Sequence, residues 1–252
     1  MGRRSATRKR SASGKRSRRD APRRGSRLSL VRAYRGRGGP RPGAGRPRRP
    51  GRRPVPHRRR AAVDPRHPQH VTTRLLAGLP SLRGRREFAV VRRSIGRGHK
   101  RDFAVVHFSV MRNHVHLIVE ALDKLALAAG MKGLKGRITK ALNRLWSRGA
   151  RRRNGTVFAE RFHARPWSTP REVRHGLSYV LNNFRRHERQ QGRGVPGRWV
   201  DPCSSARQFE GWRRNVRREA GVVEAAKTWL LSDGWRNAGG CLDVHATPGR
   251  AG

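Results

Sequence analysis

FAVVHFSVM at residues 103–111 and HVHLIVEA at residues 114–121 are the two runs that decide the fold of this chain. Both are rich in apolar and β-branched residues, which favour strands. Only Arg112 and Asn113 separate them, a length typical of a tight hairpin turn. The sequence therefore predicts two central antiparallel strands joined by a hairpin.

Further elements are predicted on both sides of this hairpin. A strand is expected at residues 70–75 and a short helix at about 86–95. From Leu127 to Leu145, apolar residues recur at steps of three and four, which predicts a long amphipathic helix. Residues 157–167 (VFAERFHARPW) alternate like one further strand.

A last helix is predicted from Thr169 to about His187. Thr169 is a suitable cap, Pro170 fits the first turn, and Glu172 stands three residues after the cap. The resulting order is strand, helix, strand, strand, helix, strand, helix. We therefore expect an α+β domain of ferredoxin-like (RRM-like) type, with an antiparallel sheet, helices on one face and an extra C-terminal helix.

The chain divides into three parts by composition. Residues 1–68 hold 25 basic and 2 acidic residues and nine of the fifteen prolines, so this tail is expected to be disordered. It is either a nonspecific DNA-binding arm or an extension without function. Residues 69–190 form the predicted domain, and residues 191–252 form a tryptophan-containing, partly ordered extension that packs on the domain or on DNA.

A formal net charge of +47 favours a polyanionic partner, and nucleic acid is the first to consider. Cys203 and Cys241 lack the spacing of a zinc ribbon or a disulfide framework, which suits a reduced cytoplasm, close to the nucleoid. No apolar run is long enough for a signal peptide or a membrane span.

Candidate metal ligands lie on the second of the two central strands. His114 and His116 are two residues apart and so project from one face, whereas Val115 and Leu117 project from the other. Such a pair is only weak evidence for a metal. The Asp-His expected of a metallo-β-lactamase-like site is missing after His116, which argues against that class.

A second pair of polar residues lies on the last helix. Tyr179 and Asn183 are four residues apart and share one face of that helix. The only other tyrosine, Tyr34, lies in the tail. From spacing alone, Tyr179 is equally well explained as a half-buried boundary residue.

These two segments carry a resemblance to a known family. MRNHVHLI at 111–118 resembles the histidine-hydrophobic-histidine (HUH) strand of single-tyrosine transposases, and SYVLNN at 178–183 resembles their tyrosine helix. The likeness runs from residue 70 to about residue 187 and is closest to the transposases associated with repetitive extragenic palindromes.

The resemblance implies a site and a reaction. Tyr179 would be the nucleophile, and His114, His116 and Asn183 would bind a divalent metal, Mg²⁺ or Mn²⁺, with the tyrosine-bearing helix on the active-site side of the sheet. The enzyme would cut and rejoin single-stranded or hairpin DNA through a 5′-phosphotyrosine, as a monomer or a homodimer. Two other hypotheses stay open: a non-catalytic DNA- or RNA-binding protein of the same fold, and a ribosome-associated basic protein.

Overall fold

The structure is a computed structural model that describes residues 62–147, 152–197 and 199–248. The predicted basic tail, residues 1–68, therefore lies almost wholly outside the described residues. Within them, the elements through α4 follow the predicted order. These are β1 (Gln69–Arg74), α2 (Arg85–Gly96), β2 (Phe103–Val110), β3 (His114–Ala121), α3 (Lys124–Trp146), β4 (His163–Pro166) and α4 (Pro170–Leu181). After them come α5 (Asn183–Gln190), η1 (Ala206–Gln208), α6 (Trp229–Ser232) and η2 (Gly234–Ala238).

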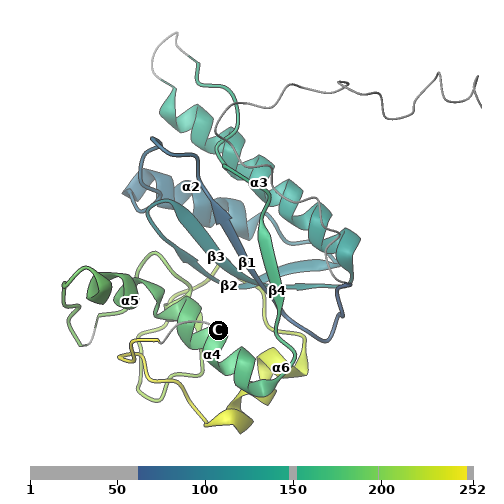
Figure 1. The fold of residues 1–252 in the computed structure, drawn as a ribbon, viewed down its shortest axis with the longest axis vertical. Helices are drawn as coiled ribbons and strands as arrows, with labels where there is room; N and C mark the ends of the chain where they lie inside the picture. Colours follow the sequence, from purple (N-terminus) through teal and green to yellow (C-terminus); the bar gives the residue numbers. More distant parts are fainter. Residues whose placement is uncertain (1–61, 148–151, 198, 249–252) are drawn as a thin grey trace, which may run out of the picture. The chain divides into compact units, whose positions relative to one another are not determined.

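The four strands form one antiparallel sheet in the order β2-β3-β1-β4, drawn in Figure 1. This order is the ferredoxin-like arrangement expected from the sequence. In its register, Thr72 of β1 and Ser109 of β2 both lie opposite His116 of β3. The hairpin and the sheet topology were thus predicted correctly.

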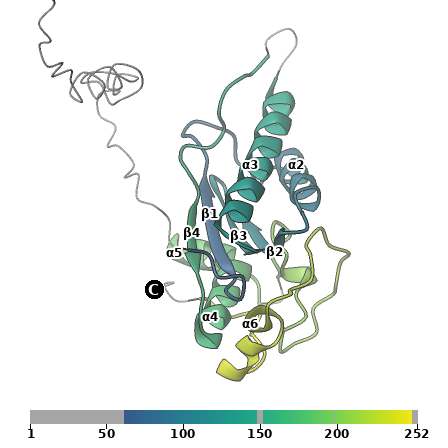
Figure 2. The same cartoon turned by 90° about the vertical axis from the view of Figure 1, so that its right-hand side faces the viewer.

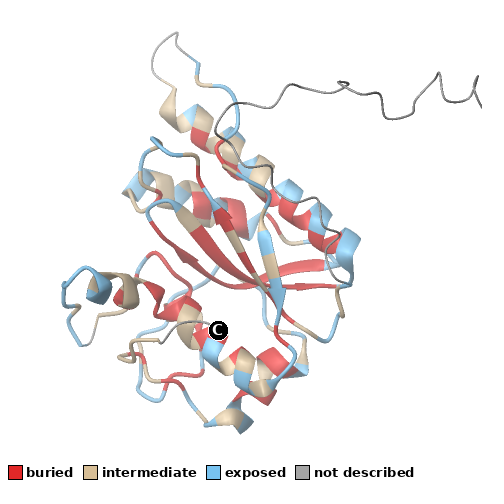
Figure 3. Cartoon of the chain, viewed as in Figure 1, coloured by how far each residue is buried: buried red, intermediate tan, exposed pale blue. Residues whose placement is uncertain are grey.

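Each face of the sheet carries its own hydrophobic core. On one face, Leu117 and its neighbours pack against α2 and α3, and on the other, Ile118 packs beneath α4 with the C-terminal segment. Figures 1 and 2 show α2 and α3 on one side of the sheet and α4 and α6 on the other. Figure 3 shows the central strands buried, as expected for a sheet covered on both faces.

Local chemistry explains where the two main helices begin. The side chain of Thr169 accepts a hydrogen bond from the backbone N–H of Glu172, and the Glu172 carboxylate accepts one from Thr169 N–H. This is the predicted capping box, and it starts α4 at the predicted place. Asp123 caps α3 in a similar way by accepting from Ala126 N–H at 2.7 Å.

Two predicted elements were partly wrong. Strand β4 covers only residues 163–166 of the predicted 157–167, because Ala159 and Val157 bond separately to the backbone of Arg74 and Leu76, at the end of β1. The last predicted helix is two helices, α4 and α5, that break at Asn182. The Asn182 side chain is buried and donates to the carbonyl of Asp243, and its backbone (φ −103°, ψ 16°) leaves the helical region.

The C-terminal segment packs on the domain. The carbonyl of Cys203 accepts from Val110 N–H. The backbone N–H of Ser205 donates to the carbonyl of Phe108, and the Ser205 hydroxyl accepts from Phe108 N–H, so residues 203–205 lie along the edge of β2. The buried carboxylate of Asp201 accepts two hydrogen bonds from the guanidinium of Arg83, at 2.8 and 3.0 Å. Of the two alternatives predicted for this extension, packing onto the domain is the one that the structure shows.

Both cysteines are unpaired, Cys203 buried and Cys241 exposed. Among the described residues, no helix has the length and apolar character needed to cross a membrane.

Candidate active site

The two histidines of β3 lie on the face of the sheet that α4 covers. Their ring centres are 4.8 Å apart. Nδ1 of His114 lies 2.8 Å from Oδ1 of Asn113, an atom that only accepts, so Nδ1 donates and Nε2 keeps its lone pair. Nδ1 of His116 lies 3.0 Å from Nε2 of His70 and 3.2 Å from the hydroxyl of Thr72. Both histidines are therefore oriented through Nδ1, which leaves Nε2 for another partner.

Tyr179 of α4 contacts this pair. Its half-buried ring is 5.4 Å from the ring of His116 and 5.8 Å from that of His70, edge-on to both. The guanidinium of Arg186 lies 5.3 Å from the centre of the tyrosine ring. The structure thus brings together the predicted nucleophile, the predicted ligand pair and a cation.

Asn183, the fourth predicted residue, begins α5 and is fully buried. Tyr179 lies four residues before it and His187 four residues after it, and their rings contact His116 and His114, at 5.4 and 5.7 Å. The helix breaks at Asn182, between Tyr179 and Asn183, so helical spacing alone does not place the Asn183 side chain. The structure brings Tyr179 and His187 to the histidine pair, and the role of Asn183 as a ligand stays a prediction.

A stack of rings supports the site, and sequence analysis missed it. His70 stacks between His116 and Trp167, at centre distances of 5.2 and 5.3 Å. Trp167 fits there because a Cβ on Gly176 of α4 would lie only 2.2 Å from its ring, so any larger residue would collide. Of the four histidines at this site, His70 and His187 had no predicted role. His187 carried a signal, since it stands four residues after Asn183.

Burial keeps the site's imidazoles neutral. It lowers the pKa of His70 and of His114 to about 4, with further lowering by nearby cations. The pKa of His116 lies well below its ordinary value for the same reason, and that of His187 is also lowered. A neutral imidazole has the lone pair that metal coordination requires.

The residues present fit a divalent cation. Among buried side-chain atoms, Nε2 of His116 and both amide atoms of Asn183 have no hydrogen-bond partner within the described chain. Such groups are costly unless something else binds them. No group of three or more His, Cys, Asp or Glu side chains in the described ranges is placed to hold a metal, so a site here depends on the Asn183 amide.

The arginines near the site fall into two groups by their contacts. Arg174 and Arg185 donate to backbone carbonyls of the C-terminal segment, Arg185 to four of them between residues 195 and 199. These two stabilise the fold. Three others are exposed on β4, α4 and the segment before them: Arg161, Arg165 and Arg171.

The chain is similar to known transposases. The family described as "Transposase IS200 like" matches residues 91–183. No curated protein matches the sequence significantly. One solved structure, of a REP-associated tyrosine transposase bound to a REP hairpin, is 16% identical and covers 69% of this chain and 99% of that chain, with a TM-score of 0.47. The stretch that matches this family, residues 91–183, includes His114, His116, Tyr179 and Asn183.

Proposed function

We propose that this chain cleaves and rejoins single-stranded or hairpin DNA, with Tyr179 as the nucleophile. One observation carries the proposal: Tyr179 lies 5.4 Å, ring to ring, from His116, whose inward Nε2 is buried without a partner. A phenol beside an unsatisfied imidazole and an unsatisfied amide is the arrangement expected of a metal-assisted nucleophile. The match of residues 91–183 to a transposase family supports this reaction class.

The reaction exchanges one phosphodiester for another. The Tyr179 oxygen forms a bond to phosphorus while the bond from phosphorus to the 3′-oxygen breaks. The phenol loses its proton, and the departing 3′-oxygen gains one to become a free hydroxyl. The 5′ end stays attached to the protein as phosphotyrosine. Attack by a 3′-hydroxyl reverses the step, so strands are rejoined without an external energy source.

His114, His116 and Asn183 are the residues that would hold Mg²⁺ or Mn²⁺. When bound, such a cation supplies Lewis-acid stabilisation of charge on the phosphate oxygens. His70 and Thr72 hold the ring of His116 through Nδ1. His70 and Thr72 therefore fix the orientation of the His116 ring before a cation binds.

Arg186 contributes a fixed positive charge. Its guanidinium lies 5.3 Å from the centre of the Tyr179 ring. A cation over an aromatic face is attracted to the ring. Arg186 is therefore placed to orient Tyr179 beside the histidine pair.

The test is a covalent adduct assay with hairpin and single-stranded DNA oligonucleotides. A label at the 3′ end should migrate with the protein on a denaturing gel, whereas a label at the 5′ end should be released on a shorter strand. Tyr179→Phe should abolish the adduct and leave oligonucleotide binding largely intact. Tyr34→Phe, at the only other tyrosine, is the matched control and should react normally.

Adducts that persist in Tyr179→Phe would refute the assigned nucleophile. Binding without any adduct, in the wild-type chain with Mg²⁺ or Mn²⁺ present, would favour the non-catalytic binder instead.

A further inference from the structure

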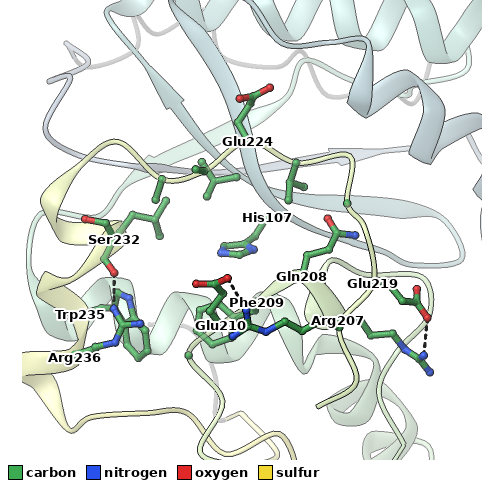
Figure 4. Close-up of a pocket in the computed structure, with 18 residues that line it drawn as sticks. His107, Arg207, Gln208, Phe209, Glu210, Glu219, Glu224, Ser232, Trp235 and Arg236 are labelled. Atoms are coloured by element: carbon green, nitrogen blue, oxygen red, sulfur yellow. Dashed lines mark hydrogen bonds and ion pairs between the residues drawn. The ribbon is translucent and has the colours of Figure 1, made fainter. Parts of the chain in front are cut away.

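A cavity lies between β2 and the C-terminal segment, away from Tyr179 and the histidine pair (Figure 4). Its volume is about 510 Å³. The walls come from β2, from the segment after η1, and from α6 and η2. The residues that matter for its chemistry are His107, Arg207, Phe209, Glu210, Arg218 and Trp235.

His107 stands at the centre of this cavity in Figure 4. The side chain belongs to a residue only 8% exposed, and its Nδ1 lies 3.3 Å from the hydroxyl of Ser205. Within the described chain its hydrogen bonding runs through Nδ1 alone, so Nε2 is available to the cavity. Burial lowers the pKa of His107 to about 4, so the ring is neutral near pH 7. It therefore offers one hydrogen bond and no charge.

Aromatic rings form the adjoining wall. Phe209 meets His107 edge-on at a centre distance of 5.4 Å and lies 5.5 Å from the ring of Trp235. The guanidinium of Arg236 lies 4.6 Å from the centre of the Trp235 ring. Phe209 is 7% exposed and Trp235 only 1%, so these rings form a rigid, closely packed apolar wall.

The charges around the cavity cancel in pairs. Arg207 contacts Glu219 at 2.6 Å, and Arg218 contacts Glu210 at 2.8 Å. Glu224 adds a further carboxylate to the lining. A phosphate would meet these carboxylates, so the cavity favours a neutral ligand over an anionic one.

We propose that this cavity binds an unpaired nucleobase. A base is flat and uncharged, and its edge carries the donors and acceptors that a single buried imidazole nitrogen can address. About 510 Å³ is ample for one base. The base belongs to the DNA strand on which the proposed reaction acts, so this part of the inference rests on the proposed function. The cavity would hold the DNA strand at a second point, away from the reacting phosphate.

The experiment compares two tryptophan substitutions in the full chain. Ala225→Trp, at an exposed residue of the cavity lining, should fill the cavity. Ala129→Trp, at an exposed residue of α3 on the opposite side of the sheet, is the matched control. Binding of a single-stranded oligonucleotide, followed by fluorescence anisotropy, should weaken about 5- to 10-fold in Ala225→Trp, the worth of one stacked base, and stay unchanged in the control. His107→Leu, with its folding checked by thermal unfolding, should also weaken binding.

Abasic substitution at each position of the oligonucleotide in turn identifies the bound base. At one position, the abasic substitution should weaken binding to the wild-type chain by the same factor. It should not weaken binding to Ala225→Trp any further, because both changes remove the same interaction. If no abasic position couples to Ala225→Trp, a DNA base in this cavity is refuted.

Free nucleosides form the second arm of the test. One result would be that a nucleoside quenches tryptophan fluorescence saturably in the wild-type chain and not in Ala225→Trp, while no abasic position couples to that variant. This result would show that the cavity binds a nucleobase, but not one from the DNA strand. Adduct formation is measured in parallel. If Tyr179→Phe still forms adducts while an abasic position couples to Ala225→Trp, the proposed nucleophile fails and the base-binding cavity stands.

Discussion

Nε2 of His70 lies 3.0 Å from Nδ1 of His116, and the two rings stack. Outer residues that orient a ligand typically contribute 10- to 100-fold to metal affinity. His70→Ala should therefore weaken Mn²⁺ binding by roughly that factor, measured by calorimetric titration. His175→Ala, at an exposed histidine of α4, is the control and should bind Mn²⁺ as the wild type does. Equal affinities in both variants would mean that His70 does not position His116.

Substitution by leucine should change the free energy of unfolding in opposite directions at Asn183 and Asn182. The Asn183 amide is buried with both polar atoms unpartnered, at a cost of about 1–3 kcal/mol each for such groups. Asn183→Leu should thus raise the metal-free free energy of unfolding, by about 1 kcal/mol or more, and remove the stabilisation by Mn²⁺.

Asn182→Leu should destabilise instead, because its side chain donates to the Asp243 carbonyl. Urea unfolding with and without Mn²⁺ measures both effects. Destabilisation by Asn183→Leu without metal would show that its amide has a structural partner after all.

Asp201 is expected to be among the most sensitive positions for folding. Its carboxylate and the Arg83 guanidinium are both mostly buried and share two hydrogen bonds. Asp201→Ala leaves the Arg83 charge buried without its partner, so we expect a loss of about 3–5 kcal/mol in the free energy of unfolding. Asp233→Ala, which removes the exposed partner of Arg236, should cost at most about 1 kcal/mol. Similar losses in the two variants would contradict a buried ion pair.

The pH dependence of stability should report His107. Its folded pKa of about 4 lies below the ordinary 6.5, so only the unfolded chain takes up this proton between those values. The stabilising contribution is complete above pH 6.5 and is lost as the pH falls towards 4, at about 1 kcal/mol per pH unit. His107→Leu should show a shallower loss over that window in urea unfolding. An unchanged slope would mean that His107 is not held neutral by burial.

Local patterns were enough to predict the strand faces. Alternation along β3 depends only on the strand period, which is why His114 and His116 were placed together and Leu117 on the opposite face. The start of α4 was equally visible, because the contacts of Thr169 and Glu172 span three residues.

Features set by distant contacts could not be predicted. The helix break at Asn182 depends on a hydrogen bond to Asp243, 61 residues later. Strand β4 is short because the segment at Val157 pairs separately with Leu76, and no local pattern reveals that register. The partnership of His70 with His116 was recoverable, because the predicted sheet order already places β1 beside β3.

Residues 203–205 cover the outer edge of β2, through the backbone hydrogen bonds of Phe108 and Val110. The family match stops at residue 183, twenty residues before this cover begins. A chain shortened to the matched residues would expose the unpaired backbone N–H and C=O groups of β2 and the apolar side chains beside them. Exposed strand edges of this kind pair with one another between chains. The stretch that matches the family therefore ends before the segment that covers this edge of the sheet.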